Sequence, residues 1–123
     1  NLFITQCNLT PDLTNKVFLI TGGTYGIGQA TIRYLAKLNA KIIFTGRSKD
    51  QGKILSAEIT IDNPDAYIHY IPCDHSSIKS VKEVCEKIKE KYSVIDCIIN
   101  NVGCFENSII TDEGYQYMLA VNY

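Results

Sequence analysis

Apolar and polar residues follow one another along this chain in blocks that predict strands and helices in turn. Short apolar runs rich in β-branched residues are typical of buried strands, and apolar residues at helical spacing are typical of amphipathic helices. The expected strands are residues 16–21, 41–45, 66–72 and 94–99, and the expected helices are residues 27–39, 54–61, 78–92 and 111–123. Ser48 is a plausible N-cap for the second helix.

The alternation of strand and helix predicts an α/β domain whose parallel sheet is covered by helices on both faces. A length of 123 residues allows one domain at most, so residues 1–15 are a lead-in and residues 16–123 form the domain. The sheet is expected to stop after its fourth strand and the following helix. A fifth strand would pair beside residues 94–99, so we expect an open edge there and a homo-oligomer or an aggregating, marginally stable chain.

Composition excludes several functional classes. The chain is 46% hydrophobic and 20% charged with a net charge of −1, which is typical of a soluble globular domain and gives no basic surface for nucleic acid. No apolar run is long enough for a membrane segment. The five cysteines are odd in number and contain no Cys-x-x-Cys pair, so no disulfide framework or metal site is indicated, and we expect an intracellular, cytoplasmic protein. Cys73, Cys85 and Cys97 are expected in the core, and His69 and His75 are expected to be exposed.

The turn after the first strand carries four glycines and leads straight into a helix. Gly22 would allow a sharp turn at positive φ, Gly26 would leave room for a phosphate, and Gly28 would let the helix lie close to the sheet. The unpaired amides of a helix N-terminus attract anions, so the turn is a candidate pyrophosphate site. A glycine-rich connection in some other α/β domain is the alternative. The candidate cofactor-binding residues of the turn are Thr21, Gly22, Thr24, Tyr25, Gly26, Ile27 and Gly28.

Polar or glycine residues follow all four predicted strands, and in a parallel sheet these carboxyl ends form the ligand site. At the second strand end, an NAD enzyme usually places a carboxylate for the ribose 2′-hydroxyl. Gly46 and Arg47 stand there instead, and a guanidinium can bind a 2′-phosphate through two hydrogen bonds. We therefore predict NADP(H) over NAD(H). A surface arginine at a helix start is the alternative interpretation of Arg47.

The glycine spacing, Gly-x-x-x-Gly-x-Gly, resembles the cofactor motif of the short-chain dehydrogenase/reductase family, and further motifs extend the resemblance over residues 13–123. It implies a Rossmann-type, doubly wound sheet. It also implies that Asp74 contacts adenine, that the stretch Asn100-Asn101-Val102-Gly103 lies beside the cofactor, and that Asn122 is the catalytic asparagine, which positions a water in a proton relay. Residues 45–47 and 111–115 resemble the branch of the retinol dehydrogenases.

Two departures from the family pattern matter. Val102 stands where the family has alanine, so the pocket beside it is expected to shift slightly. The family's catalytic serine and Tyr-x-x-x-Lys pair are absent, so this N-terminal half of a reductase is expected to be inactive alone, although the parent would interconvert a small-molecule alcohol and carbonyl. A non-catalytic nucleotide-binding module is the alternative. A receiver-like signalling domain ranks lower, because the first strand lacks paired acids at its end.

Overall fold

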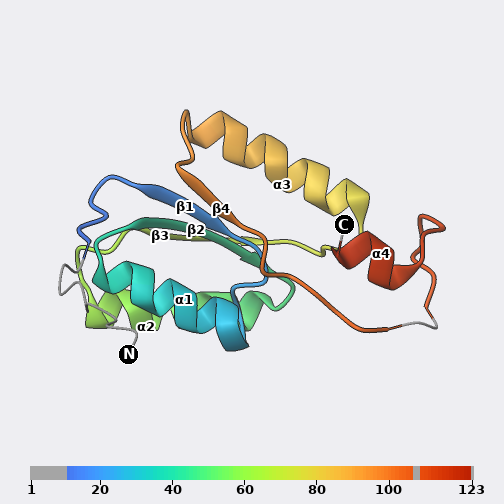
Figure 1. Ribbon diagram of the computed structural model, residues 1–123, viewed down its shortest axis with the longest axis horizontal. Helices are drawn as coiled ribbons and strands as arrows, with labels where there is room; N and C mark the ends of the chain where they lie inside the picture. Colours follow the sequence, from blue (N-terminus) through green and yellow to red (C-terminus); the bar gives the residue numbers. More distant parts are fainter. Residues whose placement is uncertain (1–10, 107–108, 123) are drawn as a thin grey trace, which may run out of the picture.

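A computed structural model describes residues 11–106 and 109–122. Strands and helices alternate in the predicted order (Figure 1). The elements are β1 (Val17–Ile20), α1 (Gly26–Lys37), β2 (Lys41–Gly46), α2 (Lys49–Asp62), β3 (Ile68–Pro72), α3 (Ile78–Lys91), β4 (Cys97–Ile99) and α4 (Tyr117–Asn122).

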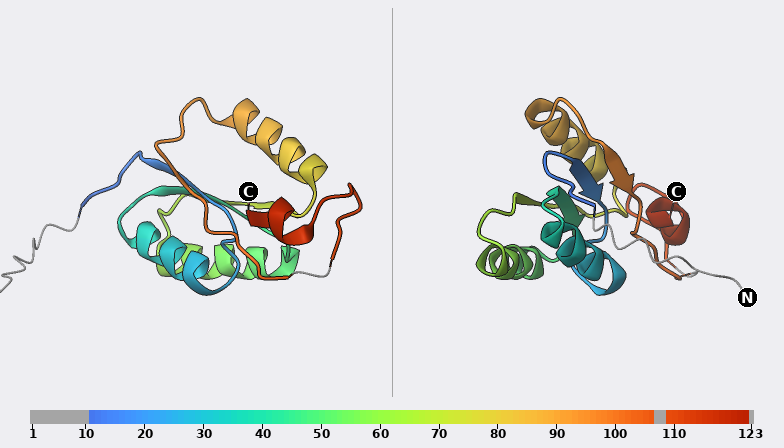
Figure 2. Two further views of the ribbon diagram at one scale, coloured as in Figure 1. Left: turned by 45° about the vertical axis from the view of Figure 1, so that its right-hand side comes forward. Right: turned by 60° about the vertical axis from the view of Figure 1, so that its left-hand side comes forward.

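The four strands form one parallel sheet in the order β3-β2-β1-β4. Helices α1 and α2 lie on one face of the sheet and α3 lies on the other (Figures 1 and 2). The chain moves outward from β1 to β3 and then crosses back to place β4 on the other side of β1. The strand order therefore reverses between β1 and β4, and in open α/β sheets ligands bind in the crevice at such a switch point.

Alternate side chains of β2 belong to two separate hydrophobic clusters, one on each face of the sheet. Ile42 and Phe44 pack under α1 and α2, whereas Ile43 faces α3, and all three are fully buried. Continuous burial along β2 is the pattern of a central strand in a doubly covered parallel sheet, as the uninterrupted apolar run predicted. Ser48 caps α2, and its hydroxyl accepts a hydrogen bond from the Gln51 amide at 3.3 Å.

The last helix begins later than predicted. Residues 109–116 form a turn closed by an antiparallel bridge between Ile110 and Gln116, and α4 starts only at Tyr117. Glu113 lies in the stretch expected to begin this helix, but its carboxylate serves a different helix. It accepts hydrogen bonds from the backbone amides of Ile78 and Lys79, at 2.9 and 3.1 Å, and so caps α3.

Strand β4 is also shorter than predicted, since only three residues pair with β1. The residue before it, Asp96, instead turns its carboxylate toward the start of β1, where it accepts a hydrogen bond from the Val17 amide at 2.8 Å and one from Lys16 Nζ at 3.0 Å. In the part of the chain that the structure describes, β4 has a strand neighbour on one side only, and its Ile98 side chain is 58% exposed.

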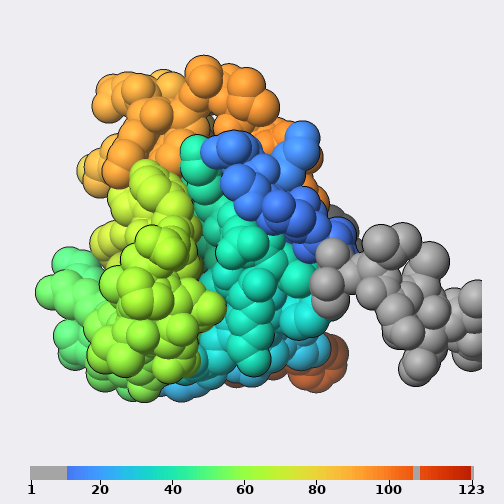
Figure 3. All heavy atoms as spheres, turned by 90° about the vertical axis from the view of Figure 1, so that its left-hand side faces the viewer, coloured from blue at the N-terminus to red at the C-terminus, as the bar shows by residue number. Residues whose placement is uncertain are grey.

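An aromatic cluster lies where β3 begins and α3 ends. It includes His69, which was expected to be exposed but is half-buried. Its Nδ1 lies 2.6 Å from the Tyr92 hydroxyl, which lies 2.8 Å from the Tyr67 hydroxyl, so this histidine has a partner. Figure 3 shows this end of the molecule, with the orange end of α3 above the yellow-green chain that enters β3. Burial and the hydrogen bond with Tyr67 raise the pKa of Tyr92.

The expectation for the cysteines is corrected in part. Cys85 is exposed, because it falls on the charged outer face of α3, whereas Cys73 is buried as expected and Cys97 is half-buried. Ile27, at the start of α1, is 79% exposed. Among residues 11–106 and 109–122, no helix has the length and apolar character needed to cross a membrane.

Candidate cofactor site

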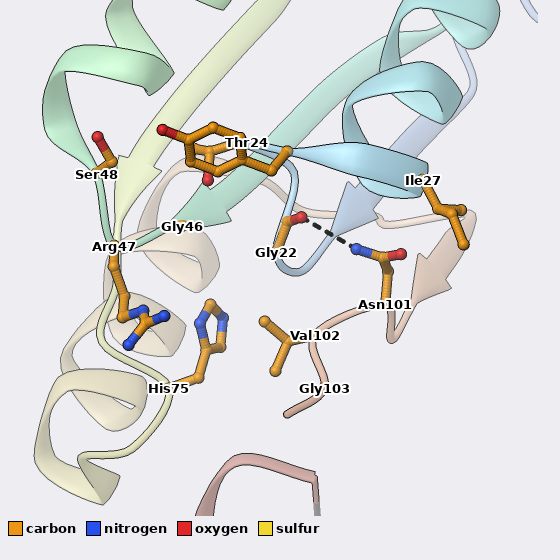
Figure 4. Close-up of a pocket in the computed structure, with 11 residues that line it drawn as sticks. Gly22, Thr24, Ile27, Gly46, Arg47, Ser48, His75, Asn101, Val102 and Gly103 are labelled. Carbon is orange, nitrogen blue, oxygen red and sulfur yellow. Dashed lines mark hydrogen bonds between the residues drawn. The ribbon is translucent and has the colours of Figure 1, made fainter. Parts of the chain in front are cut away.

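A cavity of about 670 Å³ opens at the carboxyl ends of β1, β2 and β4, at the switch point of the sheet. Figure 4 shows the residues that line it. The cavity is lined by Gly22, Thr24, Tyr25, Ile27, Gly46, Arg47, Ser48, His75, Asn101, Val102 and Gly103. Residues from all four strand ends therefore meet in one place, as the sequence predicted.

The glycine turn is built so that α1 lies against the end of β1. Gly22 has a φ of +67°, a backbone conformation that residues with a side chain rarely adopt. A Cβ added to Gly28 would stand 2.5 Å from the carbonyl oxygen of Gly22 and 2.6 Å from Asn101 Nδ2, so nothing larger than glycine fits there. A Cβ on Gly26 would meet no atom within 4 Å, which leaves open space at the N-terminus of the helix.

Asn101 joins the end of β4 to the end of β1. Its side-chain nitrogen donates to the carbonyl oxygens of Thr21 and Gly22, both at 3.0 Å (Figure 4 shows the second bond). In return, the Thr21 hydroxyl accepts hydrogen bonds from the amides of Asn101 and Val102. These four bonds fix the switch point between the two strands and leave Val102 and Gly103 on the cavity wall.

Arg47 follows β2 and projects into the cavity with His75, while Val102 lies on the far side of the imidazole (Figure 4). Among the described residues Arg47 takes part in no ion pair. Its guanidinium Nη1 donates instead to the Tyr117 hydroxyl at 2.9 Å. The cavity thus contains a cation that forms no ion pair with a carboxylate of the described residues.

His75 is the residue of this site that sequence reasoning missed. It was expected to be an exposed loop residue, but it is half-buried on the cavity wall, with its Nε2 3.0 Å from the Thr45 hydroxyl. Burial lowers the pKa of its imidazole, with Asp74 opposing this effect and Arg47 adding to it. The sequence signal was available, because His75 stands just past β3 among the polar residues of a strand end.

Some predicted site residues lie outside the cavity wall. Asp74 is exposed and its Oδ1 accepts hydrogen bonds from the amide and hydroxyl of Ser76, which lower its carboxyl pKa. Asn122 lies in α4 and holds the backbone of Cys104, donating to its carbonyl oxygen at 3.0 Å and accepting from its amide at 2.9 Å. Asn122 lines a neighbouring cavity of about 650 Å³, which also contains Thr21.

Comparison with known proteins agrees with this geometry. A sequence profile described as short chain dehydrogenase matches residues 16–123. The chain belongs to the short-chain dehydrogenase/reductase family. This membership excludes the receiver-like alternative. The chain is 33% identical over 117 residues to the short chain dehydrogenase/reductase dpchH of Colletotrichum higginsianum, and the match covers 92% of this chain but 29% of that relative.

Solved structures of the family have the same fold. L-sorbose reductase from Gluconobacter frateurii, complexed with NADPH and L-sorbose, superposes with a TM-score of 0.75 at 25% identity, covering 89% of this chain and 42% of that one. An NADPH-bound short chain oxidoreductase from Pseudomonas aeruginosa PAO1, described as containing an atypical catalytic center, gives a TM-score of 0.72 at 26% identity over 84% of this chain and 41% of that one. The chain thus spans less than half the length of these relatives.

The residues present fit a nicotinamide dinucleotide. The first amides of a helix lack intrahelical partners, and α1 begins at Gly26, between the cavity-lining residues Tyr25 and Ile27. The empty space at Gly26 would admit the pyrophosphate. Ile27, although exposed, stands on the cavity wall and offers an apolar contact there.

Proposed function

We propose that this chain binds NADP(H) in the cavity at the strand ends and is the cofactor-binding part of an oxidoreductase that interconverts an alcohol and a carbonyl compound. The single observation that carries the cofactor choice is Arg47, whose guanidinium faces the cavity and forms no ion pair within residues 11–106 and 109–122. The two solved relatives described above with NADPH support the same choice.

Three parts of the cavity would hold the cofactor. The N-terminus of α1 would bind the pyrophosphate through backbone amides, with Thr24 and Tyr25 beside it. Arg47 would bind the 2′-phosphate through charge-assisted hydrogen bonds. Val102 and Gly103 would form the wall beside the nicotinamide half, and Asp74 would approach the adenine from the end of β3.

A bound NADPH would supply the hydride that a carbonyl carbon gains, and a bound NADP⁺ would accept the hydride that an alcohol carbon loses. The protein must then supply or accept a proton at the substrate oxygen, which is general acid–base catalysis. Within this chain we assign one residue to that step: Asn122 would position a water of the proton relay. No tyrosine of the 123 residues precedes a lysine by four positions, so we expect no turnover by this chain alone.

Calorimetric titration of the chain with NADPH and with NADH tests the proposal. We expect NADPH to bind at least about tenfold more tightly, because a charge-assisted hydrogen bond contributes roughly 1.5–3 kcal/mol. Thermal unfolding should shift upward with NADPH by mass action. Equal affinity for the two nucleotides would contradict the cofactor choice, and binding of neither would contradict the proposal as a whole.

A nucleotide-binding module without catalysis is the second candidate. It also predicts NADPH binding and no turnover by this chain, so NADPH oxidation by the parent protein with a panel of ketones and aldehydes must separate the two. For the chain alone, clear turnover would contradict the expected inactivity. We also propose that the chain belongs to a branch like the retinol dehydrogenases, because the stretch Thr45-Gly46-Arg47 resembles that branch.

A further inference from the structure

We propose that Tyr117 is a positioning residue for Arg47, and that its hydroxyl group increases the preference of the site for NADP(H) over NAD(H). This inference rests on the proposed function, because it concerns the residue that would bind the 2′-phosphate. The pair joins two elements far apart in the chain, since Arg47 follows β2 and Tyr117 begins α4, 70 positions later.

The hydrogen bond from Arg47 Nη1 to the Tyr117 hydroxyl is 2.9 Å long. Within the described chain it is the only hydrogen bond that the Arg47 side chain makes. An exposed arginine normally samples many rotamers, and ordering such a side chain on binding costs conformational entropy. A partner that already orders the guanidinium lowers this cost for a ligand that the guanidinium recognises.

The nearby carboxylate does not compete for the guanidinium. Asp74 is close enough that the charge of Arg47 contributes to lowering its pKa, yet the two form no ion pair. The Asp74 Oδ1 atom is held by the amide of Ser76 at 3.0 Å and by its hydroxyl at 2.7 Å. The positive charge of Arg47 is therefore left for an anion that enters the cavity.

Tyr117 suits this role chemically. A phenol that accepts an N–H from arginine keeps its own O–H to donate, and the guanidinium keeps further N–H groups. The pair therefore presents only hydrogen-bond donors to an incoming phosphate, which is an acceptor. A hydroxyl group on the ribose offers no negative charge to this pair, so the same contact contributes little to the binding of NAD(H).

Tyr117 is itself held in place. Its backbone amide donates to the carbonyl oxygen of Ile109 at 2.9 Å, and Asn122 at the other end of α4 is fixed to the backbone of Cys104. The turn before it is fixed to α3 through Glu113. Tyr117 can thus orient Arg47, rather than move with it.

Titration of the full chain and of Tyr117→Phe with NADPH and with NADH tests the inference. Losing one neutral hydrogen bond to the guanidinium should weaken NADPH binding about three- to tenfold and leave NADH binding unchanged. Tyr34→Phe is the matched control, because Tyr34 is 59% exposed on α1 and should change neither affinity. If the role of Tyr117 is purely structural, Tyr117→Phe should weaken the binding of both nucleotides equally, and that result would overturn the inference.

A double-mutant cycle with Arg47→Met separates this inference from the proposed function. If Tyr117 acts through Arg47, Tyr117→Phe should have no further effect on the NADPH-to-NADH affinity ratio in the Arg47→Met background. A wild-type chain that prefers NADPH while Tyr117→Phe keeps or increases that preference would overturn the inference alone. A wild-type chain that binds neither nucleotide would overturn the proposed function, and this inference with it.

Discussion

The side-chain amide of Asn101 lies 3.0 Å from the carbonyl oxygen of Gly22, and it donates equally to the oxygen of the preceding residue. This contact joins the ends of the parallel strands β1 and β4, between which the strand order reverses. It also brings Gly28 of α1 so close that the helix cannot carry a side chain there.

Removing the Asn101 amide should therefore destabilise the domain. Asn101→Ala leaves two carbonyl oxygens without a donor at a partly buried position, so we expect the free energy of unfolding to fall by about 1–3 kcal/mol. Urea denaturation followed by circular dichroism measures this change. Asn100→Ala is the control, since Asn100 is exposed and its replacement should change the free energy of unfolding little. Equal losses of stability from both variants would contradict the role assigned to Asn101.

Gly28→Ala should destabilise the domain at least as much as Asn101→Ala. The added methyl group would stand 2.5 Å from the Gly22 carbonyl oxygen, so the helix must move away from the sheet end. Overpacking of this kind costs roughly 1–3 kcal/mol, and the shifted α1 would also weaken nucleotide binding. Thermal unfolding and NADPH titration measure the two effects. Gln29→Ala, one position further along α1, should leave both nearly unchanged.

Stability should fall as the pH drops below about 6.5. Burial lowers the pKa of His69 and His75 from their usual value of 6.5, so the unfolded chain binds protons that the folded chain resists. The stabilising difference is complete above pH 6.5 and is lost as the pH falls through the lowered values. His75→Gln should make the melting temperature less sensitive to pH between 5 and 7.5, whereas an unchanged pH profile would contradict this assignment.

Neutralising Glu113 should loosen the start of α3. Glu113→Gln keeps the shape of the side chain but removes the charge that two backbone amides and the Ser77 hydroxyl contact. These bonds lower the carboxyl pKa, so the stabilisation is present above the usual value of 4.5 and is lost at more acid pH. Hydrogen exchange of the Ile78 and Lys79 amides measures the effect, with Glu83→Gln on the outer face of α3 as the control.

The exposed side of β4 should drive self-association. Among the described residues β4 pairs with β1 alone, and Ile98 and Val94 are 58% and 62% exposed. Unpaired apolar edges associate, and a charge on such an edge opposes pairing. We expect sedimentation velocity to detect dimers or larger species that Ile98→Lys reduces, while Ile54→Lys, a change of an exposed residue on α2, leaves them in place. A monomeric wild-type chain would contradict this prediction.

The sequence predicted the element order and the convergence of strand ends because these follow from local patterns. Uninterrupted apolar runs indicate buried parallel strands, and glycines at fixed spacing indicate a close turn. The contacts of Asn101 with Thr21 were not predictable in detail, since they span 80 positions. The late start of α4 was missed for a related reason: the acidic residue that suits a helix start serves the start of another helix.

Histidines and exposed apolar residues were the least predictable parts of the site. His75 was assigned to solvent because its loop is polar, and only the packing of Thr45 beside it creates a half-buried position. Ile27 fitted the helical period of α1, yet it faces the cavity because it lies in the first turn, beyond the end of the sheet. The spacing of apolar residues shows which face of a helix packs on the sheet, but not which turns of the helix extend beyond the end of the sheet.

The cap that Glu113 gives to α3 has a consequence for synthesis. Ile78 emerges from the ribosome 35 residues before its capping carboxylate does. During that interval the first turn of α3 has its Ser77 cap but not the carboxylate, so it frays until the later segment arrives and docks. Completion of this helix is thereby coupled to the arrival of α4, and a nascent chain halted before residue 113 would lack both the cap and the tyrosine that faces Arg47.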